Sequence, residues 1–365
     1  MTLVKSTGNK KVNLDFNKEF INTFSEKIQT SDIQFINQTL KDLHESDVAN
    51  LIENLPNETR TKLIEIEAFN LDPDIFIELN ESIQSEVLQI LSVESIINII
   101  RRLESDDSIK ILENLDKEKK GSILEKLPPK DKFLLEEGLS YPEDSAARIM
   151  QREFTAVPSN WTVGQTIDYL RENKDLPKEF LEIFIVDNDF KPVGTVPSSR
   201  VLRTSRDAKM NSIMAEMPVL ISVNMDKEEV GLTFENYNLI SAGVVNKDNK
   251  LVGMITADDV VTVVQEEAEE DALRLAGVGD EEITDSVVVK TKRRFNWLLL
   301  NLFTALLATW VISNFGASIE QMVALAFLMP IVASMGGNAG MQTLAVTIRA
   351  IAKKELSNNN FSRVV

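Results

Sequence analysis

The sequence predicts a multidomain protein that combines α and α/β folds. We expect a helical-repeat N-terminal domain, two tandem α/β copies, an acidic connecting helix and a transmembrane helical hairpin. Three observations predict this order: an apolar phrase recurs along the first part of the chain, two strand–turn–strand segments repeat each other, and two runs without charged residues lie near the C-terminus. A chain of 365 residues is too long for one ordinary domain, so several domains are expected.

Composition excludes several classes of function. The net charge is −18, and almost all of the acidic excess precedes Lys290, which argues against nucleic acid as a partner because phosphates would be repelled. The chain has no cysteine and one histidine, His44, so disulfides, thiolate metal sites, zinc sites and histidine-based hydrolysis are not expected. No phosphate-binding loop or nucleophile elbow occurs, so we expect no enzyme. The polar N-terminus predicts no signal peptide.

Residues 1–137 are predicted to form the helical domain. A phrase of apolar residues spaced three and four apart recurs, which marks the buried stripe of a short helix, and a polar residue or proline stops each copy. Such repeats stack into a superhelical array, while an irregular helical bundle remains open. The phrases are Leu51–Pro56, Ile75–Asn80, Ile99–Glu104, Ile111–Asp116 and Ile123–Pro128.

Two modules follow, at residues 138–204 and 205–262, and they are copies of each other. Ile183–Gly194 and Ala242–Gly253 both place an Asn/Asp-rich turn between apolar runs, which predicts a hairpin, and a helix is expected after each. The strand–helix–strand–strand–helix order resembles a pair of CBS domains. That resemblance implies adenine-nucleotide binding, with ribose held by a hydroxyl and a carboxylate. Thr256 and Asp259 match this pattern in the second copy, so ATP is expected there, although the site could instead be empty. The first copy has Arg200 in place of the aspartate.

Residues 263–293 are predicted to be an acidic connecting helix and linker. Glu267, Glu270 and Asp271 lie three and four residues apart, so their like charges meet on neighbouring turns. A solvated acidic face is one interpretation. The other is a surface that a hard cation such as Mg²⁺ bridges through oxygen ligands and retained water.

Residues 294–365 are predicted to be the membrane region. Spans at about 297–316 and 321–348 have the length needed to cross a bilayer, and a short turn is expected between them. Basic residues flank both outer ends, which predicts that both ends and the preceding domains lie in the cytosol. The second span contains Gly336, Gly337, Asn338 and Gly340, residues unsuited to a plain anchor. They predict a pore lining, with tight helix packing as the other interpretation.

Taken in order, these segments resemble the MgtE-type magnesium transporters over nearly the whole chain. The resemblance rests on Leu139–Met150, Thr256–Val260, Glu266–Val278 and Met329–Gln342. It implies a homodimer in the cytoplasmic membrane that transports Mg²⁺ and senses cytosolic Mg²⁺ through carboxylates, while the acidic connecting helix plugs the pore. The sensor acids implied by position are Asp74, Asp106, Asp226, Glu228, Asp259, Glu267, Glu270 and Asp271.

Two departures from that family are visible. Asn238 and Thr262 stand where the family often has aspartate, so the sensor is expected to have fewer or weaker sites. The family has five spans and this chain shows two, so we expect a truncated transporter. The other hypothesis is a membrane-tethered CBS regulatory module that senses Mg²⁺ or adenine nucleotide without transport of its own.

Overall fold

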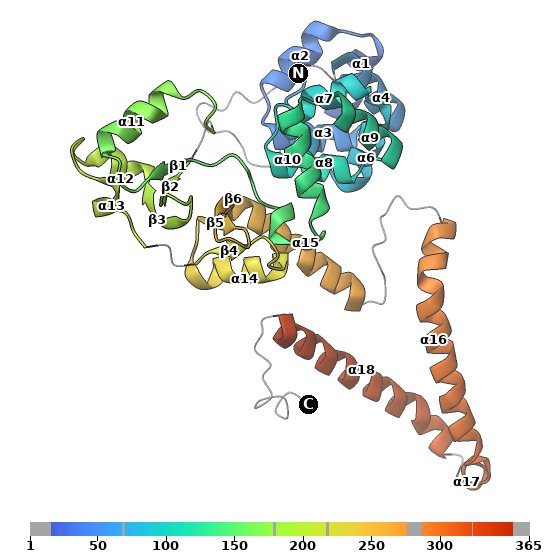
Figure 1. Ribbon diagram of the computed structural model, residues 1–365. Coiled ribbons are helices and arrows are strands. Elements are labelled where there is room, and N and C mark those ends of the chain that lie inside the picture. The colour runs from blue at the N-terminus through green and yellow to red at the C-terminus, as the bar shows by residue number, and fades with distance from the viewer. Residues whose placement is uncertain are drawn as a thin grey trace. The chain divides into compact units, whose positions relative to one another are not determined.

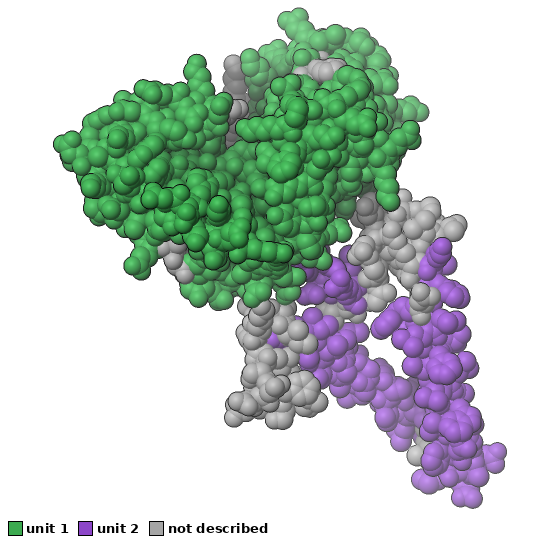
Figure 2. All heavy atoms as spheres, in the orientation of Figure 1, with its two compact units in different colours: residues 1–260 green, residues 261–365 purple. Residues whose placement is uncertain are grey.

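A computed structural model describes residues 16–67, 70–177, 180–216, 219–275, 287–322 and 324–352. The chain divides into two compact units, residues 1–260 and residues 261–365 (Figure 2). The stretch of the predicted connector at 276–286 and the basic residues Lys353 and Lys354 lie outside the described residues.

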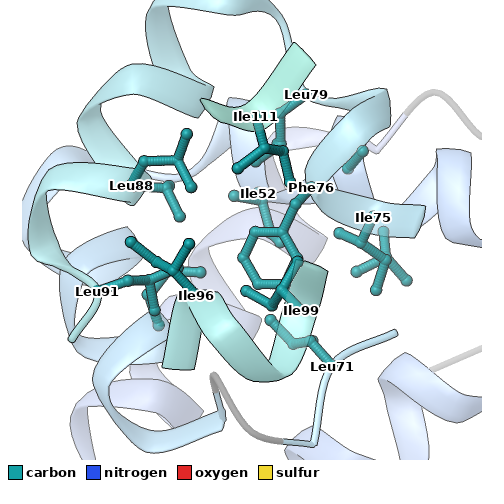
Figure 3. Packing of buried hydrophobic residues seen from close by; sticks show 14 of the residues in the cluster. Ile52, Leu71, Ile75, Phe76, Leu79, Leu88, Leu91, Ile96, Ile99 and Ile111 are labelled. Atoms are coloured by element: carbon teal, nitrogen blue, oxygen red, sulfur yellow. The ribbon is translucent and has the colours of Figure 1, made fainter. Parts of the chain in front are cut away.

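The N-terminal domain consists of short helices around one apolar core (Figure 1). Phe76 is fully buried within this core, among the isoleucine and leucine side chains of neighbouring helices (Figure 3). The predicted helical character of this part of the chain is therefore confirmed. The helices are α1 (Lys18–Gln29), α2 (Ile33–Lys41), α3 (Glu45–Asn54), α4 (Asn57–Glu67), α5 (Asp74–Glu78), α6 (Glu81–Ile90), α7 (Val93–Ile100), α8 (Ser105–Glu113), α9 (Lys117–Lys126) and α10 (Pro129–Ser140).

The recurring phrase explains why these helices are short. Its final leucine becomes the C-cap residue in extended backbone at Leu55, Leu79 and Leu127, and each of these side chains is buried. A polar side chain then caps the next helix: Asn80 accepts from the Ile83 amide at the start of α6. Where the buried leucine anchors the turn and a polar side chain caps the next amide groups, as at Leu79 and Asn80, the phrase ends one helix and begins another.

The two α/β copies have the same topology. In the first copy, β1 (Ala156–Pro158) is parallel to β2 (Glu182–Val186), which is antiparallel to β3 (Pro192–Pro197). In the second, β4 (Ile221–Ser222), β5 (Ser241–Val245) and β6 (Leu251–Thr256) repeat this arrangement, and the register shifts at the equivalent place in both hairpins. The predicted duplication is thus confirmed. The helices are α11 (Val163–Glu172), α12 (Ser198–Arg203) and α13 (Met210–Ile213), then α14 (Lys227–Tyr237) and α15 (Ala257–Leu275).

The segments that lead into the two copies are exchanged. The 3₁₀ turn η1 (Ala146–Arg148) precedes the first copy, yet Ala146 and Met150 pack in the core of the second. Conversely, Met210 precedes the second copy and packs in the core of the first. Gly253 lies against this crossing: a Cβ there would come within 2.8 Å of the Gln151 carbonyl oxygen. The segment directly after α10 is therefore part of the second copy.

The second unit contains most of α15 together with α16 (Val287–Ser313), α17 (Gly316–Gln321) and α18 (Ala324–Ala352). The sequence predicted a plain turn where α17 lies; the Ser318 and Ile319 amides both donate to the Phe315 carbonyl, so the turn is helical. Pro330 lies inside α18 without ending it. Within the described residues, no helix meets the length and apolarity required for a membrane span.

Candidate functional site

The first turn of α8 lies against the segment that leads into the first CBS copy. The Ser105 hydroxyl donates to Glu153 at 2.9 Å, and the Ser105 amide donates to the same carboxylate oxygen at 3.2 Å. The Arg152 amide donates to the Ser105 hydroxyl at 2.8 Å. These bonds fix the start of α8 on the α/β part. We call the contact between residues 104–141 of the helical region and residues 142–259 of the CBS pair the docking interface.

One part of the docking interface is held by ion pairs. Arg148 pairs with Glu113 on α8 and donates to the carbonyl oxygens of Tyr141 at 2.9 Å and Leu139 at 3.0 Å. Arg152 pairs with Glu137 of α10 at 3.0 Å. The guanidinium groups of both arginines are largely buried, and each lies beside a carboxylate of opposite charge that stabilises the docked arrangement, although Arg152 Nη2 makes no well-aligned hydrogen bond within the described residues.

The other part brings carboxylates together without enough cations. Asp106 on α8 is only 7% exposed, and its Oδ1 atom has no hydrogen-bond partner among the described residues. The carboxylate of Asp259, at the start of α15, is the strongest charged neighbour acting on Asp106, followed by Asp107. A buried oxygen without a donor is costly. Lys110 lowers the pKa of Asp107 and of Asp259, so positive charge compensates these acids in part, but Asp106 Oδ1 has no donor within the described residues.

The electrostatics of this acidic part follow from burial and like charge. Burial, followed by the repulsion of Asp259, raises the pKa of Asp106 well above its usual range. The same two causes raise the pKa of Asp107 to about 6. Glu104 lies at the exposed rim, where loss of hydration and the Glu153 carboxylate raise its pKa to about 7. Each carboxyl therefore favours a proton or another cation beside it.

The Asp259 carboxylate accepts hydrogen bonds from side chains of the second CBS copy and of the segment packed against it. The Thr256 hydroxyl donates to Asp259 Oδ2, and Gln151 Nε2 donates to the same oxygen at 3.4 Å. Burial raises the pKa of Asp259, and the Thr256 hydrogen bond opposes that shift. The pair predicted to hold a nucleotide ribose is thus bonded together and placed opposite the acidic start of α8.

The structure brings together only some of the predicted sensor residues. Asp259 is the charged group that acts most strongly on Asp106, and Asp74, at the start of α5, contributes to the raised pKa of Asp107. Asp226 has another role, since it caps α14 by accepting from the Glu228 amide at 2.9 Å, while Glu228 is exposed in that first turn. The structure also adds Glu104, Asp107, Glu153 and Asp258, which sequence reasoning missed. The acidic runs at 104–107 and 258–259 were the available signal.

The remaining predicted residues belong to the second unit. Glu267, Glu270 and Asp271 lie on α15, where Glu270 pairs with Arg274 one turn away. Gly336, Gly337 and Gly340 lie on α18, and a Cβ at any of them would meet no heavy atom within 4 Å. Asn338 lies on the same helix and is exposed. The glycine surface of α18 therefore contacts no other part of the described chain.

The chemistry of the acidic part fits a hard divalent cation with much of its water retained. Carboxylate oxygens are suitable ligands, and Asp106 Oδ1 lacks a partner. However, within the described ranges no three or more acidic or histidine side chains converge in a way that could hold a metal ion directly.

Comparison with known proteins agrees with this architecture. Residues 43–144 match a family profile described as the MgtE intracellular N domain, residues 146–207 and 210–266 match CBS domains, and residues 329–365 match the divalent cation transporter profile MgtE. The magnesium transporter MgtE of Bacillus subtilis is 29% identical over 334 residues, which is 91% of this chain and 74% of that protein. The MgtE of Thermus thermophilus is 26% identical over 94% of this chain and 77% of its own length.

Solved structures share the fold of the first unit. The soluble part of a magnesium transporter has a TM-score of 0.60 and 22% identity, covering 69% of this chain and 99% of that one. The cytosolic domain of the Mg²⁺ channel MgtE in complex with ATP has a TM-score of 0.61 and 24% identity, covering 67% and 99%. Two regions of the chain, residues 43–144 and 329–365, thus match MgtE profiles on either side of a CBS pair, and the chain resembles the MgtE transporters along most of its length.

Proposed function

We propose that this chain is a subunit of a Mg²⁺ transporter of the cytoplasmic membrane, acting as a homodimer, and that its docking interface senses cytosolic Mg²⁺. The observation that carries the sensing proposal is Asp106. Its Oδ1 atom is buried without a donor, opposite Asp259 from another domain. An arrangement of this kind is favourable only when a cation neutralises it.

The two parts of the docking interface support a two-state element. Arg148 and Arg152 hold the helical domain on the CBS pair through ion pairs with Glu113 and Glu137. Asp106, Asp107 and Asp259 oppose that contact by repulsion. When the carboxylates share a divalent cation, the docked state gains stability; when they do not, the acidic surfaces separate. Effector binding that differs between two states shifts their populations in this way.

Transport is assigned to the α16–α18 region on two grounds. The relatives are named magnesium transporters, and residues 329–365 match the transporter profile. In addition, large apolar side chains of α16 are exposed, such as Leu298, Phe303 and Trp310, each at least 59% exposed. Exposed apolar surface of this extent is typical of a membrane or protein contact. We propose that α16 and α18 form the transmembrane hairpin, with the domains before it in the cytosol.

The sensing proposal is tested by a distance measurement in the full chain. Because the sequence has no cysteine, Glu125→Cys on the helical domain and Lys247→Cys on the second CBS copy give two unique spin-label sites. We expect the distance distribution to become narrower as Mg²⁺ rises from none to about 20 mM. Asp106→Asn should reduce the amplitude of this response, while Asp248→Asn, on an exposed turn, should leave it unchanged. An identical Mg²⁺ response in the Asp106→Asn protein contradicts the sensing role.

Transport is tested separately by Mg²⁺ uptake into proteoliposomes that contain the full chain. Uptake above empty vesicles, lowered by Asn338→Leu, is expected for a subunit with its own conduction path. A Mg²⁺-dependent distance change without uptake would instead favour the membrane-tethered regulatory module. ATP at Thr256 and Asp259 remains part of the proposal: ATP binding should be weakened by Asp259→Asn if the second copy holds the ribose.

A further inference from the structure

The helix that carries Asp106 is not capped by its own N-cap residue. Glu104 is the N-cap residue of α8 and lies in extended backbone, but within the described residues its side chain makes no capping hydrogen bond. The helices around it in the sequence, α6, α7 and α9, are each capped by their own N-cap side chain, which is Asn80, Ser92 or Asp116. The first amide groups of a helix have no partner within the helix, so those of α8 need an acceptor from elsewhere.

Glu153, which leads into the first CBS copy, supplies that acceptor from 48 positions further along the chain. Its Oε2 atom accepts from the Ser105 amide at 3.2 Å and from the Ser105 hydroxyl at 2.9 Å. The Arg152 amide donates to the same oxygen at 3.1 Å and to Ser105 Oγ at 2.8 Å. One carboxylate oxygen therefore joins the first residue of α8 to the CBS pair. The partial positive charge of a helix N-terminus favours a carboxylate at this place.

The Glu153 carboxylate both opposes and supports docking. Its charge lies near other acids, and it contributes, after burial, to the raised pKa of Glu104. A residue that acted by charge alone would therefore only add to the repulsion. The hydrogen bonds that Glu153 accepts from Ser105 are attractive contacts, and they exist only while the helical domain and the CBS pair are in contact.

We propose that Glu153 is a positioning residue of the sensor, which caps α8 from the CBS side and thereby holds Asp106 and Asp107 in place only in the docked state. This inference rests on the proposed sensing function. Asp106 and Asp107 are the second and third residues of α8, so they lie within the turn that the cap completes. When the docking interface opens, this turn loses its acceptor and unwinds more readily. The ordering of the two acids is then coupled to docking, and so to the cation that favours docking.

The test is amide hydrogen exchange of the full chain in detergent micelles, followed at single residues by mass spectrometry over a Mg²⁺ series. Glu153→Ala removes both the acceptor and the charge. At about 20 mM Mg²⁺ we expect the Ser105 and Ser108 amides to exchange about fivefold faster than in the original protein, which corresponds to ~1 kcal/mol. The Mg²⁺ concentration at half-maximal protection should rise by a similar factor. The Ser108 amide reports the first hydrogen bond of α8, which it donates to the Glu104 carbonyl oxygen at 3.0 Å.

Glu153→Gln separates capping from repulsion, because it removes the charge but keeps an oxygen that can accept from Ser105. Protection of the Ser105 amide should stay within about twofold of the original, and the Mg²⁺ midpoint should not rise. If Glu153 acted only by repelling Glu104, both variants would instead dock at lower Mg²⁺.

Asp116→Ala is the matched control. It removes the cap of α9, where the Asp116 side chain accepts from the Lys119 amide at 2.8 Å. Exchange should become faster at Lys119 while the Mg²⁺ midpoint stays unchanged.

The proposal is overturned if the Ser105 and Ser108 amides exchange equally fast in the original protein and in Glu153→Ala. It is also overturned if the alanine and glutamine variants both raise or both lower the Mg²⁺ midpoint. A protein whose exchange does not respond to Mg²⁺ at all contradicts the sensing function, while the comparison of the two variants at one Mg²⁺ concentration still decides whether Glu153 caps α8.

Discussion

The two parts of the docking interface differ in how their buried charges are compensated. Around Arg148 and Arg152, every buried charge meets an opposite charge or a carbonyl oxygen. Around Asp106, buried carboxylates meet one another. The ion-paired part supplies attraction that needs no effector, and the acidic part supplies a penalty that an effector can remove. When attraction by the ion pairs and repulsion between the carboxylates are similar in size, the docked and separated states have similar free energies. A small change in the repulsion then changes which of the two states is populated.

The largest expected effect comes from the ion-paired part. Arg148→Ala removes one ion pair and two carbonyl contacts from a side chain that is 14% exposed, and it leaves Glu113 without its partner. We expect docking to weaken by about 3 kcal/mol. The spin-label distance should then stay broad even at high Mg²⁺. Arg206→Ala, which breaks an exposed pair with Asp168, is the matched control and should leave the distance unchanged.

A change of pH addresses the acidic part as a whole. Burial, followed by repulsion from a carboxylate of the CBS pair, raises the pKa of Asp107 to about 6 and that of Glu104 to about 7. A raised pKa means that the docked state binds protons more tightly, so its stabilisation is complete below the undocked pKa and is lost as pH rises through about 6 to 7. In Mg²⁺-free buffer, lowering the pH from about 8 to 5.5 should increase the docked fraction about tenfold. A docked fraction that falls on acidification would show that the carboxyls do not control docking.

Removing the charge of Asp107 alone tests whether several carboxylates contribute to the repulsion that opposes docking. Asp107→Asn keeps the size of a partly buried side chain and removes its charge, so it should raise the docked fraction in Mg²⁺-free buffer about threefold to fivefold. Mg²⁺ titration of the labelled protein should then begin from a more docked state. The comparison is Asp131→Asn on α10, where the starting state should match that of the original protein.

The smallest expected effect comes from an exposed ion pair. Lys227 pairs with Asp144 at 3.1 Å, but the Asp144 side chain is 70% exposed. Both residues lie on the CBS side of the docking interface and the pair is exposed, so Lys227→Ala should weaken docking by at most ~0.5 kcal/mol, and added salt should remove most of that difference. A loss as large as that of Arg148→Ala would mean that exposure is a poor guide to the strength of these pairs.

Local patterns predicted much of this molecule. The recurring phrase ending in leucine predicted the short helices, and the duplicated turns predicted two equivalent hairpins, because both patterns depend on residues close in sequence. The pairing of Arg148 with Glu113 spans 35 positions and depends on how two domains meet. Asp106 and Asp259 were named through resemblance, whereas Glu104 and Glu153 required the docked arrangement. The exchange of the segments before the two CBS copies left no periodic signal at all.

That exchange also sets an order for folding during synthesis. The helical domain can close as soon as α10 leaves the ribosome, since its core uses only residues up to Leu139. Ala146 and Met150 come next, but their core partners include Val244 and Ile255, about a hundred positions later. These apolar side chains stay without their core partners until the ribosome has synthesised the whole first copy, which takes roughly 5–20 s at ordinary translation rates. A nascent chain paused within that interval presents an incomplete hydrophobic surface, and this is where a chaperone would act.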